Sequence, residues 1–290
     1  MTTIGWDKIR VLVTNGCNYR CPFCHNEGQE KGGKASLMSV KDFYQLVDFL
    51  KKHPISEFVI SGGEPFLHPD IVEMLVYACQ NLDCDVSCAT NLSKISDSDI
   101  LKLADTRVKF NIQFPYIDDI RFKQSTGNGC LSTILENIKK VKAAGLEVGL
   151  NTVIQSSDKE RVEEMVQFAA RNRLPLKLLP QIGGCNSQEY KTWVFPIIRK
   201  YAISEKDKGT GAIRWEIEIG ADKTSILYID SPCFSRDITT CKRFAELRVH
   251  LGLVMQSCIE KPLSEQLDFS QGEEYVVNQL LNEWNNFKKC

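Results

Sequence analysis

The sequence predicts an α/β fold in which a partial (β/α)6 barrel of parallel strands precedes a small α+β extension. Six short apolar stretches typical of strands alternate with helical stripes up to Pro180. This alternation favours a parallel sheet with right-handed crossovers, and six repeats suit a partial barrel better than an eightfold one. After Pro180 hairpin-like pairs replace the alternation. We therefore expect a barrel over residues 1–182 and an extension over residues 183–290.

The expected barrel strands are short and apolar, and the expected helices carry apolar residues three and four positions apart. The strands cover residues 8–14, 57–60, 85–89, 108–114, 147–154 and 176–179. The helices begin near residues 40, 69, 96, 131 and 158.

The extension shows a different pattern. A helix is expected over residues 190–201, and two antiparallel pairs over 214–219 with 225–229 and over 247–250 with 253–257. Apolar residues from Tyr275 to Phe287 recur at helical spacing, which predicts an amphipathic closing helix over the core.

The composition excludes several classes of protein. With 290 residues, 43% hydrophobic and 25% charged, the chain is an ordinary globular one. Its formal charge of −1 argues against general nucleic-acid binding. No apolar run approaches the roughly 18 residues of a membrane helix, and no signal peptide is visible. We expect a cytoplasmic protein with no membrane partner.

Twelve cysteines are many for such a chain. Four are scattered through apolar, periodic stretches, where a thiol acts as a small core hydrophobe: Cys79, Cys84, Cys88 and Cys130. Two groups of three remain to be explained, one near the start of the chain and one near its end.

Three cysteines at C-x3-C-x2-C spacing follow the first expected strand: Cys17, Cys21 and Cys24. Asn18, Arg20 and Pro22 between them are poor core residues. Three thiolates on one loop suit an Fe–S cluster, or a zinc ion with His25 as a fourth ligand. Ligand sites in α/β folds lie at the carboxyl ends of strands, where this loop begins.

The second expected strand ends at Gly62-Gly63-Glu64-Pro65. Its glycines let the backbone approach a ligand closely, and Glu64 offers an acceptor for an ammonium group. Alone, this loop reads as an ordinary strand-to-helix turn, but beside the cysteine triplet it favours a ligand site.

The cysteine spacing resembles the signature of the radical S-adenosylmethionine (SAM) superfamily. The resemblance implies a 4Fe–4S cluster whose uncoordinated iron binds the amino and carboxylate groups of SAM. It further implies that an electron cleaves SAM to a 5′-deoxyadenosyl radical, which takes hydrogen from substrate. The electron would come from a reducing partner such as flavodoxin or ferredoxin.

The resemblance also implies positions that contact SAM. Gly62, Gly63 and Glu64 correspond to the motif that binds the methionine amino group, and Phe23 and Leu179 to positions near the adenine. Polar residues at other strand ends match contacts to the ribose and carboxylate, although polar residues end strands routinely: Thr90, Asn91, Gln113 and Asn151.

The late cysteines resemble the C-terminal region of the GTP 3′,8-cyclase branch, which has a SPASM/twitch-like cluster region. The resemblance implies a second 4Fe–4S cluster on Cys233, Cys241 and Cys258. It also implies that Arg243 and Arg248 bind substrate. Zinc with His250, or simple packing of the thiols, are the alternatives, and the arginines could be solvated strand residues.

Three functions remain open. The first is a radical SAM enzyme acting on a nucleotide-like small molecule. Gly16, where the cyclase branch has arginine, leaves room for another nucleotide or a peptide. The second is a peptide maturase forming thioether or carbon–carbon crosslinks or epimers. Its leader-binding domain would be a separate protein, because seven residues precede the first strand. The third is a non-catalytic Fe–S or zinc protein, which would not need the Gly-Gly-Glu-Pro loop.

Overall fold

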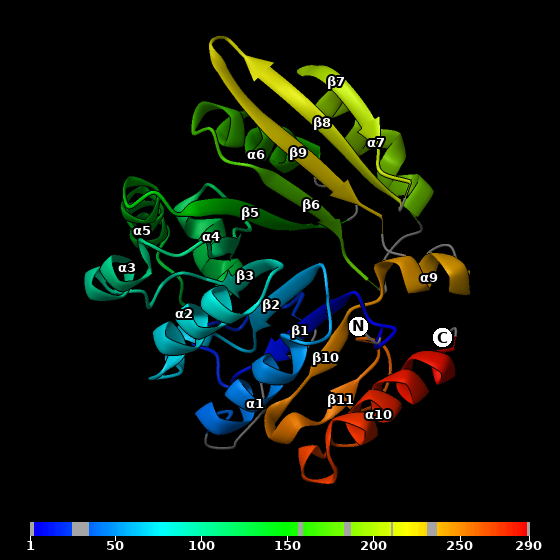
Figure 1. Cartoon of the computed structure of the whole chain (residues 1–290). Coiled ribbons are helices and arrows are strands. Elements are labelled where there is room, and N and C mark those ends of the chain that lie inside the picture. The colour runs from blue at the N-terminus through cyan, green and yellow to red at the C-terminus, as the bar shows by residue number, and fades with distance from the viewer. Residues whose placement is uncertain are drawn as a thin grey trace.

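The computed structural model describes residues 3–24, 35–155, 159–182, 187–209, 211–230 and 237–288. Its centre is one sheet of 11 strands in the order β11-β10-β1-β2-β3-β4-β5-β6-β9-β8-β7, accompanied by helices (Figure 1). This mostly parallel arrangement confirms the predicted α/β partial barrel.

The six predicted barrel strands are all present and pair in parallel, each with the next along the chain. They are β1 (Lys8–Leu12), β2 (Glu57–Ser61), β3 (Asp85–Thr90), β4 (Lys109–Gln113), β5 (Glu147–Ile154) and β6 (Leu176–Pro180).

The helices between them confirm the five predicted ones and add α4. They are α1 (Val40–Leu50), α2 (Ile71–Asn81), α3 (Asp97–Leu103), α4 (Asp119–Thr126), α5 (Leu131–Ala143) and α6 (Lys159–Arg171), with a 3-10 turn η1 (Pro65–Leu67). The sequence gives little sign of α4, because it buries just Phe122 and Thr126. Its start is fixed by Asp118, whose side chain accepts a hydrogen bond from the amide of Arg121.

Strands and helices meet through alternate strand positions. Ile9 and Val11 of β1 are fully buried, and on β2 the ring of Phe58 packs 6.0 Å from that of Phe43 on α1. The alternate positions of β1, Lys8 and Arg10, are polar and half-buried. Side chains alternate between the two faces of a strand, so the inner face of the barrel is the polar one.

The extension adds strands to both edges of the barrel sheet. Beyond β6, β9 pairs parallel to it, followed by antiparallel β8 and β7. Beyond β1, β10 pairs parallel to it, followed by antiparallel β11. The elements are α7 (Ser187–Arg199), β7 (Ala202–Asp207), β8 (Ala212–Ile219), β9 (Asp222–Ile229), α9 (Ile238–Phe244), β10 (Leu247–Val249), η2 (Leu251–Leu253), β11 (Met255–Gln256), η3 (Phe269–Gln271) and α10 (Glu273–Asn286).

Both predicted antiparallel pairs are confirmed, whereas β7 and α9 were not predicted. Five of the six residues of β7 are exposed, so it carries no apolar alternation that would reveal a strand. The boundary at residue 182 stays a prediction, and the two parts share one sheet.

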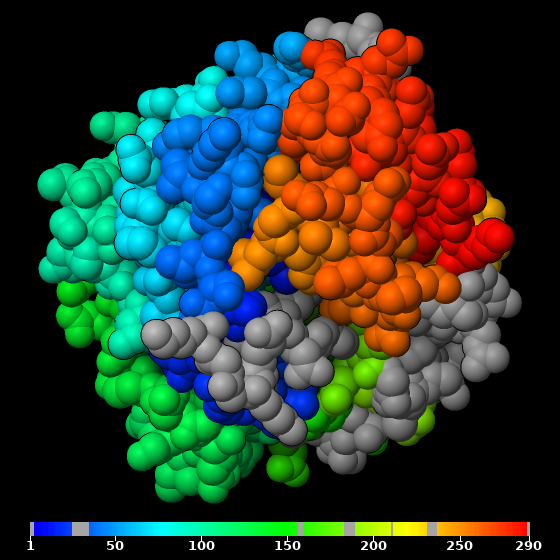
Figure 2. Space-filling view, turned by 90° about the horizontal axis from the view of Figure 1, so that it is seen from below, coloured from blue at the N-terminus to red at the C-terminus, as the bar shows by residue number. Residues whose placement is uncertain are grey.

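The closing helix packs against the start of the chain, as its pattern predicts. The indole Nε1 of Trp6 donates to the carbonyl of Leu280 at 3.1 Å, and its ring meets that of Trp284 edge-on at 4.9 Å. In Figure 2 the C-terminal residues, orange to red, also lie beside the blue surface formed by α1 and the residues around it.

One expectation about the scattered cysteines is wrong. Cys88 is fully buried and Cys79 and Cys84 are partly so, but Cys130 is exposed. It occupies the N-cap position of α5, one residue before the buried stripe begins at Leu131.

Candidate functional site

The site residues predicted in the barrel lie toward the carboxyl ends of its strands. The cysteine loop follows β1, and Gly62 to Glu64 follow β2. Thr90 and Asn91 lie at the end of β3 and Gln113 ends β4, while Asn151 and Leu179 lie within β5 and β6. All the site residues predicted in the barrel therefore lie on the side of the barrel where its strands have their carboxyl ends.

The cysteine loop and the Gly-Gly-Glu loop are bonded to each other through their backbones. The amide of Gly63 donates to the carbonyl of Thr14, and that of Glu64 to the carbonyl of Gly16, each at 2.8 Å. A Cβ on Gly63 would overlap the Gly16 carbonyl, and Gly62 has φ 142° with its Cβ position 2.5 Å from the Thr14 oxygen. The two glycines are therefore required for this close approach.

Asn18 and Arg20 also hold the cysteine loop, through three hydrogen bonds that the sequence pattern does not reveal. The amide oxygen of Asn18 accepts from the side chain of Asn91 at 2.9 Å, and its nitrogen donates to Ser93 at 2.8 Å. On the other side the amide of Arg20 donates to the carbonyl of Thr126 in α4 at 2.8 Å. The one available signal was the polar Asn18 between two ligand-type cysteines.

The three thiols are half-buried on one tight turn. The amide of Cys24 donates to the carbonyl of Cys21 at 3.1 Å, and that of Tyr19 donates to the sulfur of Cys17 at 3.3 Å. Burial raises the pKa of the Cys17 thiol and raises that of Cys21 to about 12. These thiols are therefore protonated at neutral pH until a metal displaces the proton.

The cysteine triplet fits a 4Fe–4S cluster by its donor chemistry. Three thiolates from one loop are the ligands that such clusters take. Within the described residues no group of three His, Cys, Asp or Glu side chains is arranged for a single metal ion. Cluster thiolates bind separate irons and stand farther apart than the ligands of one ion. His25, the zinc alternative's fourth ligand, lies outside the described residues.

Glu64 follows β2 at the carboxyl ends of the strands, and its side chain is fully buried. One carboxylate oxygen accepts from the hydroxyl of Thr90 at 2.5 Å and from the amide of Phe66 at 3.1 Å. The other accepts from the amide of Asn91 at 2.7 Å. Burial raises the pKa of Glu64 to about 7, although these hydrogen bonds lower it. The carboxylate thus joins the ends of β2 and β3.

The raised pKa of Glu64 predicts a pH dependence of ligand-free stability. The folded carboxyl holds its proton more tightly than the unfolded one, so its stabilising contribution is complete below pH 4.5 and is lost as the pH rises through about 7. We expect the stability of the parent relative to Glu64→Gln to fall by roughly 3 kcal/mol across this range. Urea unfolding of both proteins at several pH values measures the difference, and a pH-independent difference would contradict the burial argument.

Two side chains, one at the end of β4 and one within β5, offer unsatisfied polar atoms to a ligand. Gln113 and Asn151 are register partners on β4 and β5. The Nε2 of Gln113 and the Oδ1 of Asn151 are buried, and no hydrogen-bond partner lies near them among the described residues. Leaving such atoms unpaired is costly, so a polar ligand such as SAM fits here.

A cavity of about 300 Å³ opens beside Phe23, between the cysteine loop and α4. Tyr116, Gln155 and Arg161 also line it, and the Arg161 guanidinium lies 4.6 Å from the ring centre of Tyr116. This size lies at the lower end of the range for small-ligand sites. Phe23 thus borders a space of suitable size for part of a ligand.

The residues predicted in the extension are less closely assembled. Cys233 lies outside the described residues, Cys241 is in α9 and Cys258 follows β11. The exposed Arg243 donates to the carbonyl of Gly209 at 3.1 Å. Arg248 faces the barrel interior beside Arg10 and has its Nη2 3.6 Å from the carboxylate of Glu246. Burial, with the charge of Arg10, lowers the pKa of Arg248 to about 9.

The described helices include none that is both long and apolar enough to cross a membrane.

Comparison with known proteins agrees with this geometry. A family model for the radical SAM superfamily matches residues 11–169. A probable GTP 3′,8-cyclase of Saccharolobus solfataricus is 32% identical over 165 residues, which are 56% of this chain and 53% of that protein. Another from Sulfolobus acidocaldarius is 30% identical over 173 residues, 58% of this chain and 53% of that protein. The chain thus matches about half the length of these curated relatives.

Two solved structures show the same fold at low sequence identity. Streptococcus suis SuiB bound to its precursor peptide SuiA has a TM-score of 0.70 and 14% identity, over 97% of this chain and 67% of that one. Native anSMEcpe with bound SAM has a TM-score of 0.55 and 15% identity, over 67% of this chain and 60% of that one. Because the family model covers more than half of the 290 residues, this chain belongs to the radical SAM superfamily, which implies a 4Fe–4S cluster and SAM.

Proposed function

We propose that the protein cleaves SAM reductively at a 4Fe–4S cluster held by Cys17, Cys21 and Cys24. The cluster supplies the electron for this cleavage. Gly62, Gly63 and Glu64 shape the binding site for the methionine end of SAM, and Gln113 and Asn151 offer polar contacts to the rest of it. Bound in this way, SAM would supply a radical able to take a hydrogen atom from a substrate within the barrel.

One observation carries this proposal. The cysteine loop and the Gly-Gly-Glu loop are bonded backbone to backbone, at 2.8 Å for both hydrogen bonds. A metal-binding loop alone would need no second loop so close that a Cβ on Gly63 would overlap it. The pairing suits a cofactor that contacts both loops, and a non-catalytic Fe–S or zinc protein would not require it.

The proposal is tested by anaerobic reconstitution with iron and sulfide, followed by incubation with SAM and dithionite. Chromatography should show 5′-deoxyadenosine and methionine forming together. A fully loaded protein that yields neither would exclude the proposed reaction.

The substrate we favour is a nucleotide-like small molecule. The relatives at 30% identity or more are named as probable GTP 3′,8-cyclases. A peptide is the second candidate, because the SuiB fold with its bound precursor peptide covers 97% of this chain and so includes the extension. Incubating the active protein with GTP and other nucleoside triphosphates, and separately with peptides, distinguishes the two.

The tail cysteines are proposed to hold a second 4Fe–4S cluster. The parent should then bind about eight irons per chain, and a variant with Cys233, Cys241 and Cys258 changed to alanine about four. We expect Arg243→Ala to weaken substrate binding with the iron content unchanged, because Arg243 is exposed and its guanidinium donates to a backbone carbonyl, that of Gly209, at the surface. Iron and sulfide assays provide the measurement. If the fully reconstituted parent binds four irons, the tail cysteines hold no second cluster, and they either bind zinc or simply pack.

A further inference from the structure

The segment that follows β4 runs beside the proposed SAM site and is held on two sides. The amide of Phe114 donates to the carbonyl of Asn151 at 2.9 Å, and its carbonyl accepts from the hydroxyl of Thr152 at 2.7 Å. The ring of Phe114 also stacks on that of Phe168 in α6, with 5.4 Å between the ring centres. The chain therefore leaves β4 along a path that β5 and α6 fix together.

Arg161 holds the next part of this segment. It is the third residue of α6, and 2% of its surface is exposed. Its Nη1 donates to the carbonyl of Pro115 at 3.1 Å, and its Nη2 donates to that of Val153 at 2.8 Å. The guanidinium also lies 4.6 Å from the ring centre of Tyr116. One side chain thus ties the segment after β4 to the end of β5 and packs against the ring of Tyr116.

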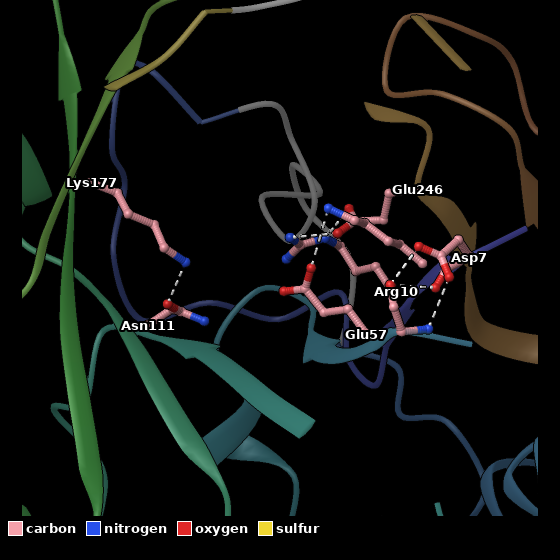
Figure 3. A network of polar contacts seen from close by, with 8 residues as sticks. Asp7, Arg10, Glu57, Asn111, Lys177 and Glu246 are labelled. Atoms are coloured by element: carbon pink, nitrogen blue, oxygen red, sulfur yellow. Dashed lines mark hydrogen bonds and ion pairs between the residues drawn. The ribbon is translucent and has the colours of Figure 1, made fainter. Parts of the chain in front are cut away.

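Arg10 shows another way in which this protein holds an arginine. Its guanidinium bonds the carboxylate of Glu246 at 2.5 Å, and in Figure 3 these two side chains lie close together, with Glu57 nearby. There an acid and a base neutralise each other. The two hydrogen bonds of Arg161 described above end on main-chain carbonyls instead. A planar guanidinium has its donors in a rigid fork, so these bonds fix the position of the backbone.

Arg161 and Tyr116 both line the cavity of about 300 Å³ beside Phe23. Tyr116 is half-buried, so the guanidinium covers part of its ring and part remains accessible. An aromatic ring offers a stacking surface to any nucleobase. The cavity lies next to the cysteine loop, and a ligand held at that loop can place a base in it.

We propose that Arg161 is a positioning residue for SAM, because it holds Tyr116 as an aromatic wall of this cavity on which the adenine stacks. The inference rests on the proposed function and deepens it by adding two residues to the cofactor site. Arg161 acts through the ring of Tyr116 and the backbone beside it, and the ring makes the contact with the cofactor.

The affinity for SAM tests this inference, by anaerobic equilibrium dialysis of the reconstituted protein with labelled SAM. Tyr116→Ala removes the ring and leaves the carbonyl bonds of Arg161 in place. It should bind SAM about tenfold more weakly, because one base–aromatic stack is lost. Tyr116→Phe keeps the ring and should bind like the parent. Arg161→Met should resemble Tyr116→Ala, because the ring loses its support.

The matched control is Arg171→Met on the same helix. Arg171 is exposed, and its Nη2 donates to the side-chain oxygen of Gln167 at 3.3 Å. This variant removes a guanidinium from α6 without touching the cavity, so its affinity for SAM should equal that of the parent. If Arg161→Met does not fold, Arg161→Lys replaces it, because an ammonium lacks the planar fork that holds two carbonyls.

A double variant separates positioning from direct contact. If Arg161 acts through Tyr116, Arg161→Met combined with Tyr116→Ala should bind SAM no more weakly than Tyr116→Ala alone, because both changes remove the same wall. Two independent contacts would instead give additive losses, near a hundredfold in total. The apparent KM for SAM should rise in each single variant, while the cleavage rate at saturating SAM stays close to that of the parent.

Binding and cleavage are measured separately, so this inference and the proposed function can fail separately. A loaded parent that binds SAM without forming 5′-deoxyadenosine would reject the proposed reaction, and the affinities of the variants would still test the wall. Three results would overturn the inference: no binding of SAM by the parent, parent-like affinity in Tyr116→Ala or Arg161→Met, or additive losses in the double variant. A lower unfolding midpoint of Arg161→Met at parent-like affinity would reduce Arg161 to a structural link.

Discussion

Replacing Cys17, Cys21 and Cys24 together by alanine should abolish formation of 5′-deoxyadenosine from SAM. The three thiolates are the proposed iron ligands, and without them no cluster supplies the electron. Chromatography of reaction mixtures with dithionite measures the product. The matched control changes three cysteines outside the site, Cys79, Cys84 and Cys130, which are half-buried or exposed. The control should retain cleavage, and unchanged product in the first variant would refute the assignment.

Gly63→Ala should have the second largest effect. The added Cβ would overlap the carbonyl oxygen of Gly16, and this backbone leads directly into Cys17. The cysteine loop must then shift, which we expect to cost roughly 1–3 kcal/mol of stability. A displacement near 1 Å can lower the rate of SAM cleavage on the order of a hundredfold.

Gly149→Ala on β5 is the control for Gly63→Ala, because its Cβ would make ordinary contacts at 3.7–3.9 Å. Urea unfolding and the cleavage rate should be close to those of the parent. If Gly63→Ala behaves like this control, the two loops are not as closely paired as described.

The sequence predicts the barrel well because its signals are local. Apolar stripes such as Leu131 to Val141 and the buried positions of β1 to β6 follow fixed periods, and the structure has them where they are expected. Elements whose stability depends on distant contacts leave weaker patterns. In β7 the exposed residues obscure the strand, and α4 buries just two side chains.

The features of the site also fall into local ones, which the sequence reveals, and distant contacts, which it does not. Cysteine spacing and paired glycines can be read from the sequence because the chemistry of a ligand loop lies within a few residues. The link from Asn18 to Asn91 and the bond from Arg161 to Pro115 join residues 73 and 46 positions apart. An arginine on an amphipathic helix is usually exposed, so the burial of Arg161 and its contacts appear only in three dimensions.

The most direct test of the central claim is the electron paramagnetic resonance spectrum of the reconstituted, dithionite-reduced protein with and without SAM. A 4Fe–4S cluster on three cysteines would leave one iron able to bind SAM. The signal of the reduced 4Fe–4S cluster should therefore change when SAM is added, and the change should be absent from the Cys17, Cys21 and Cys24 variant. A fully loaded parent whose cluster signal is the same with saturating SAM would contradict the account.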